Sequence, residues 1–186
     1  MISVSTTFFP GAHSLESDLC FSSSDSVLFY AHSQVILAAS ENAFSSFLSG
    51  FFSKENRRDI VFNIPEESAV LNVILHALYN ISCAQHSPSL QTLVKAVDRM
   101  QYYDIMPKKH LGLGTPLYML LLSHAPLYPM DVYSLAANFD LEDLAVNLAS
   151  HLLSYSLSLM SDEVALRMGP IYLKRLAGLQ LGRTLR

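Results

Sequence analysis

The feature that most constrains the fold is the stretch of residues 18–47, in which two short β-type runs lead directly into helical periodicity. Residues 19–21 and 27–30 are rich in β-forming side chains, and the polar run between them favours a turn, so we expect a β-hairpin. Over residues 33–40 the apolar positions recur at helical spacing. A hairpin that runs straight into a helix predicts a fold of the α+β class.

The rest of the sequence is dominated by helical patterns. Ser40 is a candidate N-cap for a second helix, which carries Phe44 and Phe47. Residues 59–64 predict a third strand, and a wide apolar stripe after it predicts a central core helix that ends at Tyr79. Further helices are predicted over residues 88–103, 115–122, 132–139, 140–153, 161–168 and 170–181. We therefore expect a predominantly helical α+β fold, in which a small three-stranded sheet is covered by helices.

The length of 186 residues allows one hydrophobic core with a helical appendix. Residues 1–14 mix Ser, Thr, Pro and Gly, so we expect a flexible N-terminal segment that pairs at most at a sheet edge. Residues 15–125 are expected to form the α+β domain. Residues 126–186 are expected to form extra helices packed on that domain.

A short internal echo marks two helix junctions. Tyr103-Asp104-Ile105 and Phe139-Asp140-Leu141 each lie between one predicted helix and the next. A solenoid needs about three repeats or more, so these two copies are better explained as stacked helix pairs within one domain.

The low charge of the chain bears on its function. Charged residues make up 15% of the sequence, against about 25% in average globular proteins, so part of the apolar surface is expected to face a protein partner. A net charge of −4 argues against direct nucleic-acid binding, which needs a basic stripe. No run reaches the roughly 18 apolar residues of a membrane span, and no secretion signal is evident. We expect an intracellular protein, cytoplasmic or nuclear, without membrane contact.

Residues that support catalysis or metal binding do not gather into a motif. Cys83 and His86 form the only ligand-like pair, and a structural zinc site needs a second pair. Cys20 lies in a predicted strand and is typical of a small buried hydrophobe. Paired carboxylates at residues 66–67, 142–143 and 162–163 each start a predicted helix, where they complement the helix dipole. We therefore expect no metal, no cofactor and no enzymatic activity.

The hairpin and the helices after it resemble the core of the BTB (POZ) domain. In that core an Asp opens the first strand, the second strand ends in Phe-x-Ala-His, and the following helices carry apolar residues at fixed positions. The residues that carry the resemblance are Asp18, Phe29, Ala31, His32, Leu37, Ala39, Ser40, Phe44, Phe47 and Tyr79. His32 is expected to support the fold by hydrogen bonding. The arrangement after Tyr79 and the helical tail look closest to the stand-alone BTB proteins that are abundant in fungi.

The resemblance implies a protein–protein interaction module. BTB domains form homodimers or hetero-oligomers through the N-terminal strand and the first helix, so the expected partner is a second copy or another protein. The candidate interface residues are Leu28, Tyr30, Gln34 and Phe44, and for Leu28 and Phe44 a position in the core is an equal alternative.

Two alternative functions remain open at this point. Some BTB proteins dock a cullin scaffold as substrate adaptors of a ubiquitin ligase, often with a Glu in the loop after the long helix. The corresponding loop here, residues 80–87, contains no Glu, so a cullin partner is weakly supported. The other alternative is a transcriptional co-regulator that acts through protein contacts.

Overall fold

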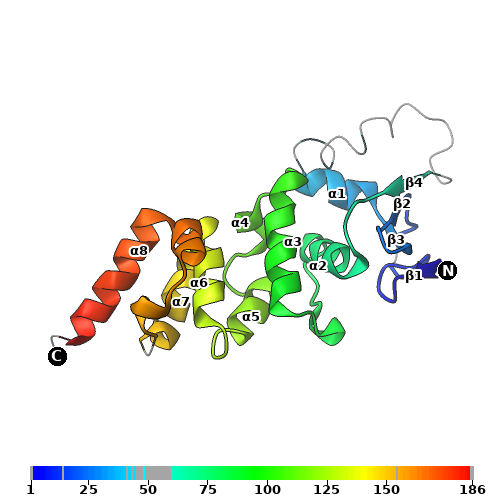
Figure 1. Cartoon of the computed structure of the whole chain (residues 1–186). Helices are drawn as coiled ribbons and strands as arrows, with labels where there is room; N and C mark the ends of the chain where they lie inside the picture. Colours follow the sequence, from blue (N-terminus) through cyan, green and yellow to red (C-terminus); the bar gives the residue numbers. More distant parts are fainter. Residues whose placement is uncertain are drawn as a thin grey trace. The chain divides into compact units, whose positions relative to one another are not determined.

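The fold was analysed in a computed structural model that describes residues 2–13, 15–40, 42, 44, 48, 60–153 and 155–184. Phe47, Asp59 and most of the predicted second helix lie outside these residues. The chain divides into two compact units, Met1–Met106 and Pro107–Arg186, whose elements are labelled in Figure 1. The fold is α+β and predominantly helical, as predicted.

The first unit contains a four-stranded mixed sheet with the order β1-β3-β2-β4. The predicted hairpin is confirmed, because β2 (Leu19–Ser22) and β3 (Val27–Ala31) pair antiparallel. β4 (Val61–Asn63), the predicted third strand, pairs parallel with β2. The prediction of three strands was wrong by one, because β1 (Ser3–Val4) adds a parallel edge strand to β3.

β1 comes from the N-terminal segment that the sequence predicted to be flexible. Two residues are too few to show an alternating pattern, so this strand has no signal in the sequence. Backbone hydrogen bonds hold it, with Ser3 N donating to Ser26 O (3.2 Å) and Ser5 N donating to Leu28 O (2.8 Å). Farther along the same segment, Phe8 is fully buried.

The helices of the first unit are α1 (Ser33–Ala39), α2 (Ser68–Leu78) and α3 (Leu90–Tyr102), with a 3₁₀ turn, η2 (Ala84–His86), between the last two. α2 is the predicted core helix, since eight of its eleven residues are buried and it packs against α3. The predicted start of α3 needs a small correction. Ser89 is the N-cap, because its side chain accepts a hydrogen bond from Thr92 N, and Pro88 precedes the helix.

The second unit is helical throughout its regular structure. It comprises α4 (Pro107–His110), α5 (Pro116–Ser123), α6 (Pro129–Asn138), α7 (Glu142–Leu152), η3 (Leu157–Leu159) and α8 (Asp162–Thr184). α6 packs against both α7 and α8 around buried leucines at positions 135, 144, 148 and 176. α8 consists of two helical pieces that meet at Gly169, whose φ of 73° is left-handed, so the two final helices predicted from the sequence are confirmed.

The two compact units part between Met106 and Pro107. The α+β domain predicted over residues 15–125 includes α4 and α5, whereas both helices lie in the second compact unit. The boundary predicted between residues 125 and 126 concerns where the family fold ends, and it stays a prediction. Among the described helices, none combines the length and the apolar character that crossing a membrane requires.

The echoed triplets are helix-ending motifs. Asp104 and Asp140 both adopt left-handed φ, at 55° and 50°. Ile105 N donates to Met100 O and Leu141 N donates to Ala136 O, which is the long hydrogen bond of a Schellman motif. The structure adds a third copy, because Asn80 has a φ of 52° and Ile81 N donates to His76 O. An aromatic residue, a left-handed Asn or Asp and an aliphatic residue thus end α2, α3 and α6.

Candidate functional site

The two faces of the sheet differ in what they contact. Leu19, Phe21, Phe29 and Ala31 point to one face and are at most 2% exposed, so this face belongs to the core. The opposite face, which we call the outer sheet face, is only partly covered. It contains Val4, Cys20, Leu28, Tyr30 and Val61, together with the polar residues Ser22 and Asn63 at one end.

The strand register places these five side chains together. Val4 pairs with Leu28, and Cys20 pairs with both Tyr30 and Val61. Val4 and Val61 are each 46% exposed, whereas Leu28 and Tyr30 are half-buried. Two of the predicted interface residues, Leu28 and Tyr30, thus lie on one partly exposed apolar surface.

An open pocket of about 320 Å³ adjoins the outer sheet face at Cys20 and Tyr30. Pro10, Gly11 and Asp18 also line it. Burial raises the pKa of the Cys20 thiol, although a hydrogen bond with Tyr30 partly offsets the effect. The thiol therefore stays protonated at neutral pH and is a poor nucleophile. The pocket provides a concave surface with apolar contacts, and its Cys20 thiol is not a reactive group.

The start of α1 is held by side chains from elsewhere in the unit. Asp18 accepts hydrogen bonds from Ser33 N (2.7 Å) and Ser33 Oγ (2.5 Å), so its carboxylate satisfies the helix N-terminus. α1 itself buries only Ile36 among its seven residues, and Gln34 is exposed. Gln34 is therefore accessible on the first helix, as the candidate interface requires.

His32 has the structural role that the sequence predicted. Tyr79 Oη lies 2.8 Å from both His32 N and His32 Nδ1, and His32 Nε2 lies 3.0 Å from Leu15 O. The carbonyl requires a proton on Nε2, so Nδ1 accepts from the tyrosine hydroxyl. Burial raises the pKa of Tyr79 to about 12. The hydrogen bonds between Tyr79 and His32 link the end of α2 to the junction of β3 and α1.

Phe44 is a core residue, which corrects its place among the candidate interface residues. It is fully buried and stacks on Phe21 and on Tyr103, at ring-centroid distances of 5.5 Å and 4.3 Å. Ser40 fixes this region, because Ser40 Oγ donates to Tyr103 O and accepts from Phe44 N, each at 2.8 Å. Of the other residues that carry the resemblance, Phe29 and Ala31 are buried, and Leu37 and Ala39 are half-buried.

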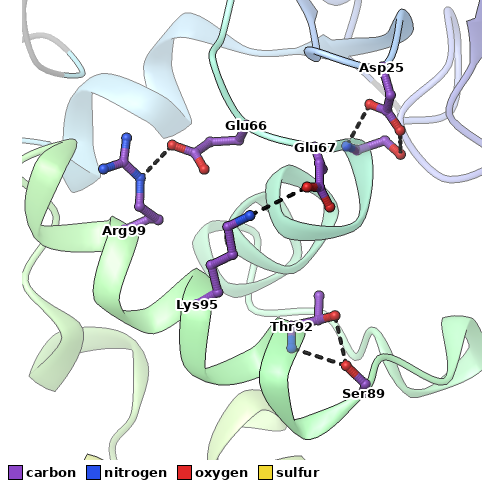
Figure 2. Close-up of polar contacts among 8 residues, drawn as sticks. Asp25, Glu66, Glu67, Ser89, Thr92, Lys95 and Arg99 are labelled. Carbon is purple, nitrogen blue, oxygen red and sulfur yellow. Dashed lines mark hydrogen bonds and ion pairs between the residues drawn. The ribbon is translucent and has the colours of Figure 1, made fainter.

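Sequence reasoning missed a buried ion pair between Glu66 and Arg99 (Figure 2). Glu66 is 3% exposed, and its Oε1 accepts from Arg99 Nε at 2.5 Å and from Tyr103 Oη at 3.0 Å. Burial would lower the pKa of Arg99, but the hydrogen bond and charge of Glu66 raise it overall. The prediction that Glu66 lies in the first turn of a helix was wrong, because α2 begins at Ser68.

The N-terminus of α2 is capped by Asp25 from the hairpin turn (Figure 2). Asp25 accepts from Ser68 N at 2.8 Å and from Ser68 Oγ at 2.6 Å. Burial alone would raise the pKa of Asp25, but the hydrogen bonds from Ser68 and Ser23 hold it below its usual value. Because the cap comes from a distant residue, a search for local capping sequences could not find it.

Within the part of the chain that the structure describes, no group of three or more His, Cys, Asp or Glu side chains is arranged to hold a metal ion. Comparisons with protein-family models, with curated proteins and with solved structures found no match. The outer sheet face and the adjoining start of α1 form the candidate functional site, because Val4 and Val61 are exposed there and Gln34 is accessible.

Proposed function

We propose that this chain is a non-enzymatic protein-interaction module of the BTB type, which self-associates or binds a second protein through the outer sheet face. The observation that carries the proposal is the partly exposed apolar surface of Val4, Leu28, Tyr30 and Val61 on strands of one sheet. Support for the BTB-type fold comes from the hairpin that leads into α1 and from the Asp18 and His32 contacts.

The edge position of β1 favours an interaction with another chain. Ser3 N and Ser5 N bond to the β3 side, so strand alternation turns the peptide groups of Val4 toward the outside of the sheet. An edge strand with outward peptide groups accepts a further strand from a partner. Ile2 and Val4 are exposed beside this edge and add apolar area to such a contact.

The chemistry of the buried ionisable groups supports the non-enzymatic part of the proposal. Glu66 is bonded to Arg99 and Tyr103, and Cys20 has a raised pKa. These groups are engaged in structural contacts or are held in an unreactive form.

A charge on the outer sheet face tests the proposal. Val4→Asp is expected to weaken association by roughly tenfold or more, because burial of one aliphatic side chain contributes about 1.5–3 kcal/mol. Val146→Asp is the matched control, since Val146 is an exposed valine on α7. Light scattering coupled to size-exclusion chromatography over a concentration series measures the self-association of both variants and of the unmodified chain.

Binding of a different protein is tested by cross-linking in the native cell with the unmodified chain and both variants. We expect Val4→Asp to lose the cross-linked species and Val146→Asp to keep it. A chain that stays monomeric at high concentration and forms cross-links that Val4→Asp does not affect would overturn the proposal.

A further inference from the structure

Four histidines from four separate segments gather around Phe8 and Tyr79. They are His13 in the N-terminal segment, His32 before α1, His76 in α2 and His86 in η2. Phe8 contacts the rings of His13, His76 and Tyr79 at centroid distances of 5.9, 5.0 and 5.2 Å. We call these six residues the histidine–aromatic cluster.

The cluster attaches the N-terminal segment to the first unit. The buried Phe8 ring packs edge-on against His76, and Phe8 O accepts a hydrogen bond from Tyr30 N at 2.8 Å. The ring of His13 stacks on Tyr79 with an interplanar angle of 22°. Thr7 Oγ1 lies 3.0 Å from His86 Nε2. Several of the contacts that hold residues 2–13 are therefore made with titratable rings.

His76 is built into this cluster in its neutral form. The side chain is 1% exposed, and Nδ1 lies 2.7 Å from Asn72 O, which requires the proton on Nδ1. Nε2 of His76 and Nε2 of His13 are both buried, and neither has a hydrogen-bond partner among the described residues. A second proton on His76 would place a charge in a buried site that offers that proton no acceptor.

The groups that face His76 make its protonation more costly. The His86 ring lies 5.1 Å from the His76 ring between centroids, and a positive charge on His86 lowers the pKa of His76. The His32 ring lies 5.5 Å from the His13 ring. Tyr79 stays neutral because burial raises its pKa to about 12, and the nearby carboxylate of Asp18 is already bonded to Ser33.

We propose that the histidine–aromatic cluster is a pH-sensitive latch: protonation of His76 at mildly acidic pH releases residues 2–13, which include β1, while the rest of the first unit stays folded. The contacts that carry this proposal lie within one chain. The rest of the unit can stay folded because α2 and α3 pack on each other through fully buried residues outside the cluster, among them Leu71, Ile74, Leu93 and Val97.

The direction of the pH dependence follows from His76. Burial lowers the pKa of His76, and the charge of His86 lowers it further, while the Asn72 hydrogen bond opposes both. The released state therefore binds more protons than the latched state below about pH 6.5, where histidine ordinarily titrates. The latch is fully effective above that pH and weakens as the pH falls through it.

Hydrogen exchange on the full chain tests the latch. Between about pH 7.5 and about pH 5.5, after correction for intrinsic exchange, the amides of residues 2–13 are expected to lose protection, because the released state binds a proton that His76 lacks in the latched state. The amides of α3 serve as the internal reference and are expected to change by less than about twofold. Unchanged protection of residues 2–13, or equal loss in both segments, would overturn the proposal.

Variants separate protonation of the cluster from a general effect of acid. His76→Phe keeps an aromatic ring beside Phe8 without a titratable nitrogen, and it is expected to reduce the pH dependence. His151→Gln is the control, because His151 is exposed on α7 in the second unit. A pH dependence that His76→Phe retains in full would contradict the latch. If His76→Phe fails to fold, unchanged protection of residues 2–13 in the unmodified chain, or equal loss in residues 2–13 and α3, would still overturn it.

Discussion

At the scale of single residues, the first unit depends on polar contacts that join segments far apart in the chain. Glu66 links the start of α2 to Arg99 on α3, and Tyr79 links the end of α2 to His32. Each of these contacts leaves a buried polar group without its partner if one side chain is removed. Such losses cost more than the intact bond contributes.

The neighbouring residues Glu66 and Glu67 provide a matched test. Glu66→Ala is expected to destabilise the first unit by about 2 kcal/mol, less than the roughly 3–5 kcal/mol of a fully buried pair, because the Arg99 side chain is 32% exposed. Glu67→Ala is the control and should cost less than about 0.5 kcal/mol, since its contact with Lys95 is at the surface. The urea dependence of amide exchange in α3 measures both. Equal effects would show that burial of Glu66 contributes nothing.

The hydroxyl of Tyr79 is expected to contribute to the stability of the first unit at both neutral and alkaline pH. Tyr79→Phe should destabilise the first unit by about 1–2 kcal/mol near neutral pH, because His32 loses its partner. The raised pKa of about 12 means that the contribution of Tyr79 is complete below about pH 10 and is lost as the pH rises through 12. Between these two pH values, the melting temperature should fall less steeply with pH for Tyr79→Phe than for the unmodified chain. Tyr128→Phe, at an exposed tyrosine, should change neither quantity.

At the scale of elements, three helices end in the same way. Asn80, Asp104 and Asp140 occupy the left-handed position after α2, α3 and α6, where glycine carries no steric cost. Asp140 also accepts hydrogen bonds from Lys108 Nζ (2.6 Å) and Tyr172 Oη (2.8 Å). The same backbone motif therefore carries an additional tertiary contact in the second unit.

Glycine substitutions separate these two roles. Asp104→Gly is expected to raise the stability of the first unit by up to about 1 kcal/mol, because a left-handed conformation strains residues with a Cβ atom. Asp140→Gly should instead be neutral or destabilising, since the strain that it relieves is offset by the loss of the Lys108 and Tyr172 contacts. Thermal unfolding of the two variants measures the difference. A gain of equal size for both would mean that the Asp140 contacts contribute nothing.

The elements also show how far sequence reasoning reaches. The hairpin, the core helix, the helix α5 and the separation of the two last helices at Gly169 depend on local patterns and were predicted. The Glu66–Arg99 pair and the Asp25 cap depend on residues that are distant in sequence, so local patterns gave no sign of them. In the candidate site, Leu28, Tyr30 and Gln34 are at least partly accessible, whereas Phe44 belongs to the core. The sequence could not predict this difference, because an apolar residue on a helix gives the same pattern whether it faces the core or a partner.

At the scale of the whole molecule, the chain contains two compact units with separate sets of buried residues. Phe21, Phe29 and Ile74 belong to the first set, and Leu144 and Leu148 belong to the second. Separate cores permit separate unfolding transitions, as in proteins with more than one domain.

A cavity in one core tests this independence. Leu144→Ala removes a fully buried side chain of α7 and is expected to destabilise the second unit by about 2–5 kcal/mol. Hydrogen exchange should then increase in α6, α7 and α8, while protection of α2 and α3 stays unchanged. Increased exchange in all five helices would show that the two units unfold together.

The packing of Phe8 also has a consequence for the order in which the protein folds during synthesis. Phe8 contacts His76 in α2 and Tyr79 at the end of that helix. β3, which pairs with β1, also comes after residues 2–13 in the chain. Chains are made from the N-terminus, so residues 2–13 leave the ribosome well before the surfaces that bury them exist. Phe8 is therefore expected to stay accessible to chaperones until α2 has emerged, and docking of this segment is a late step of folding.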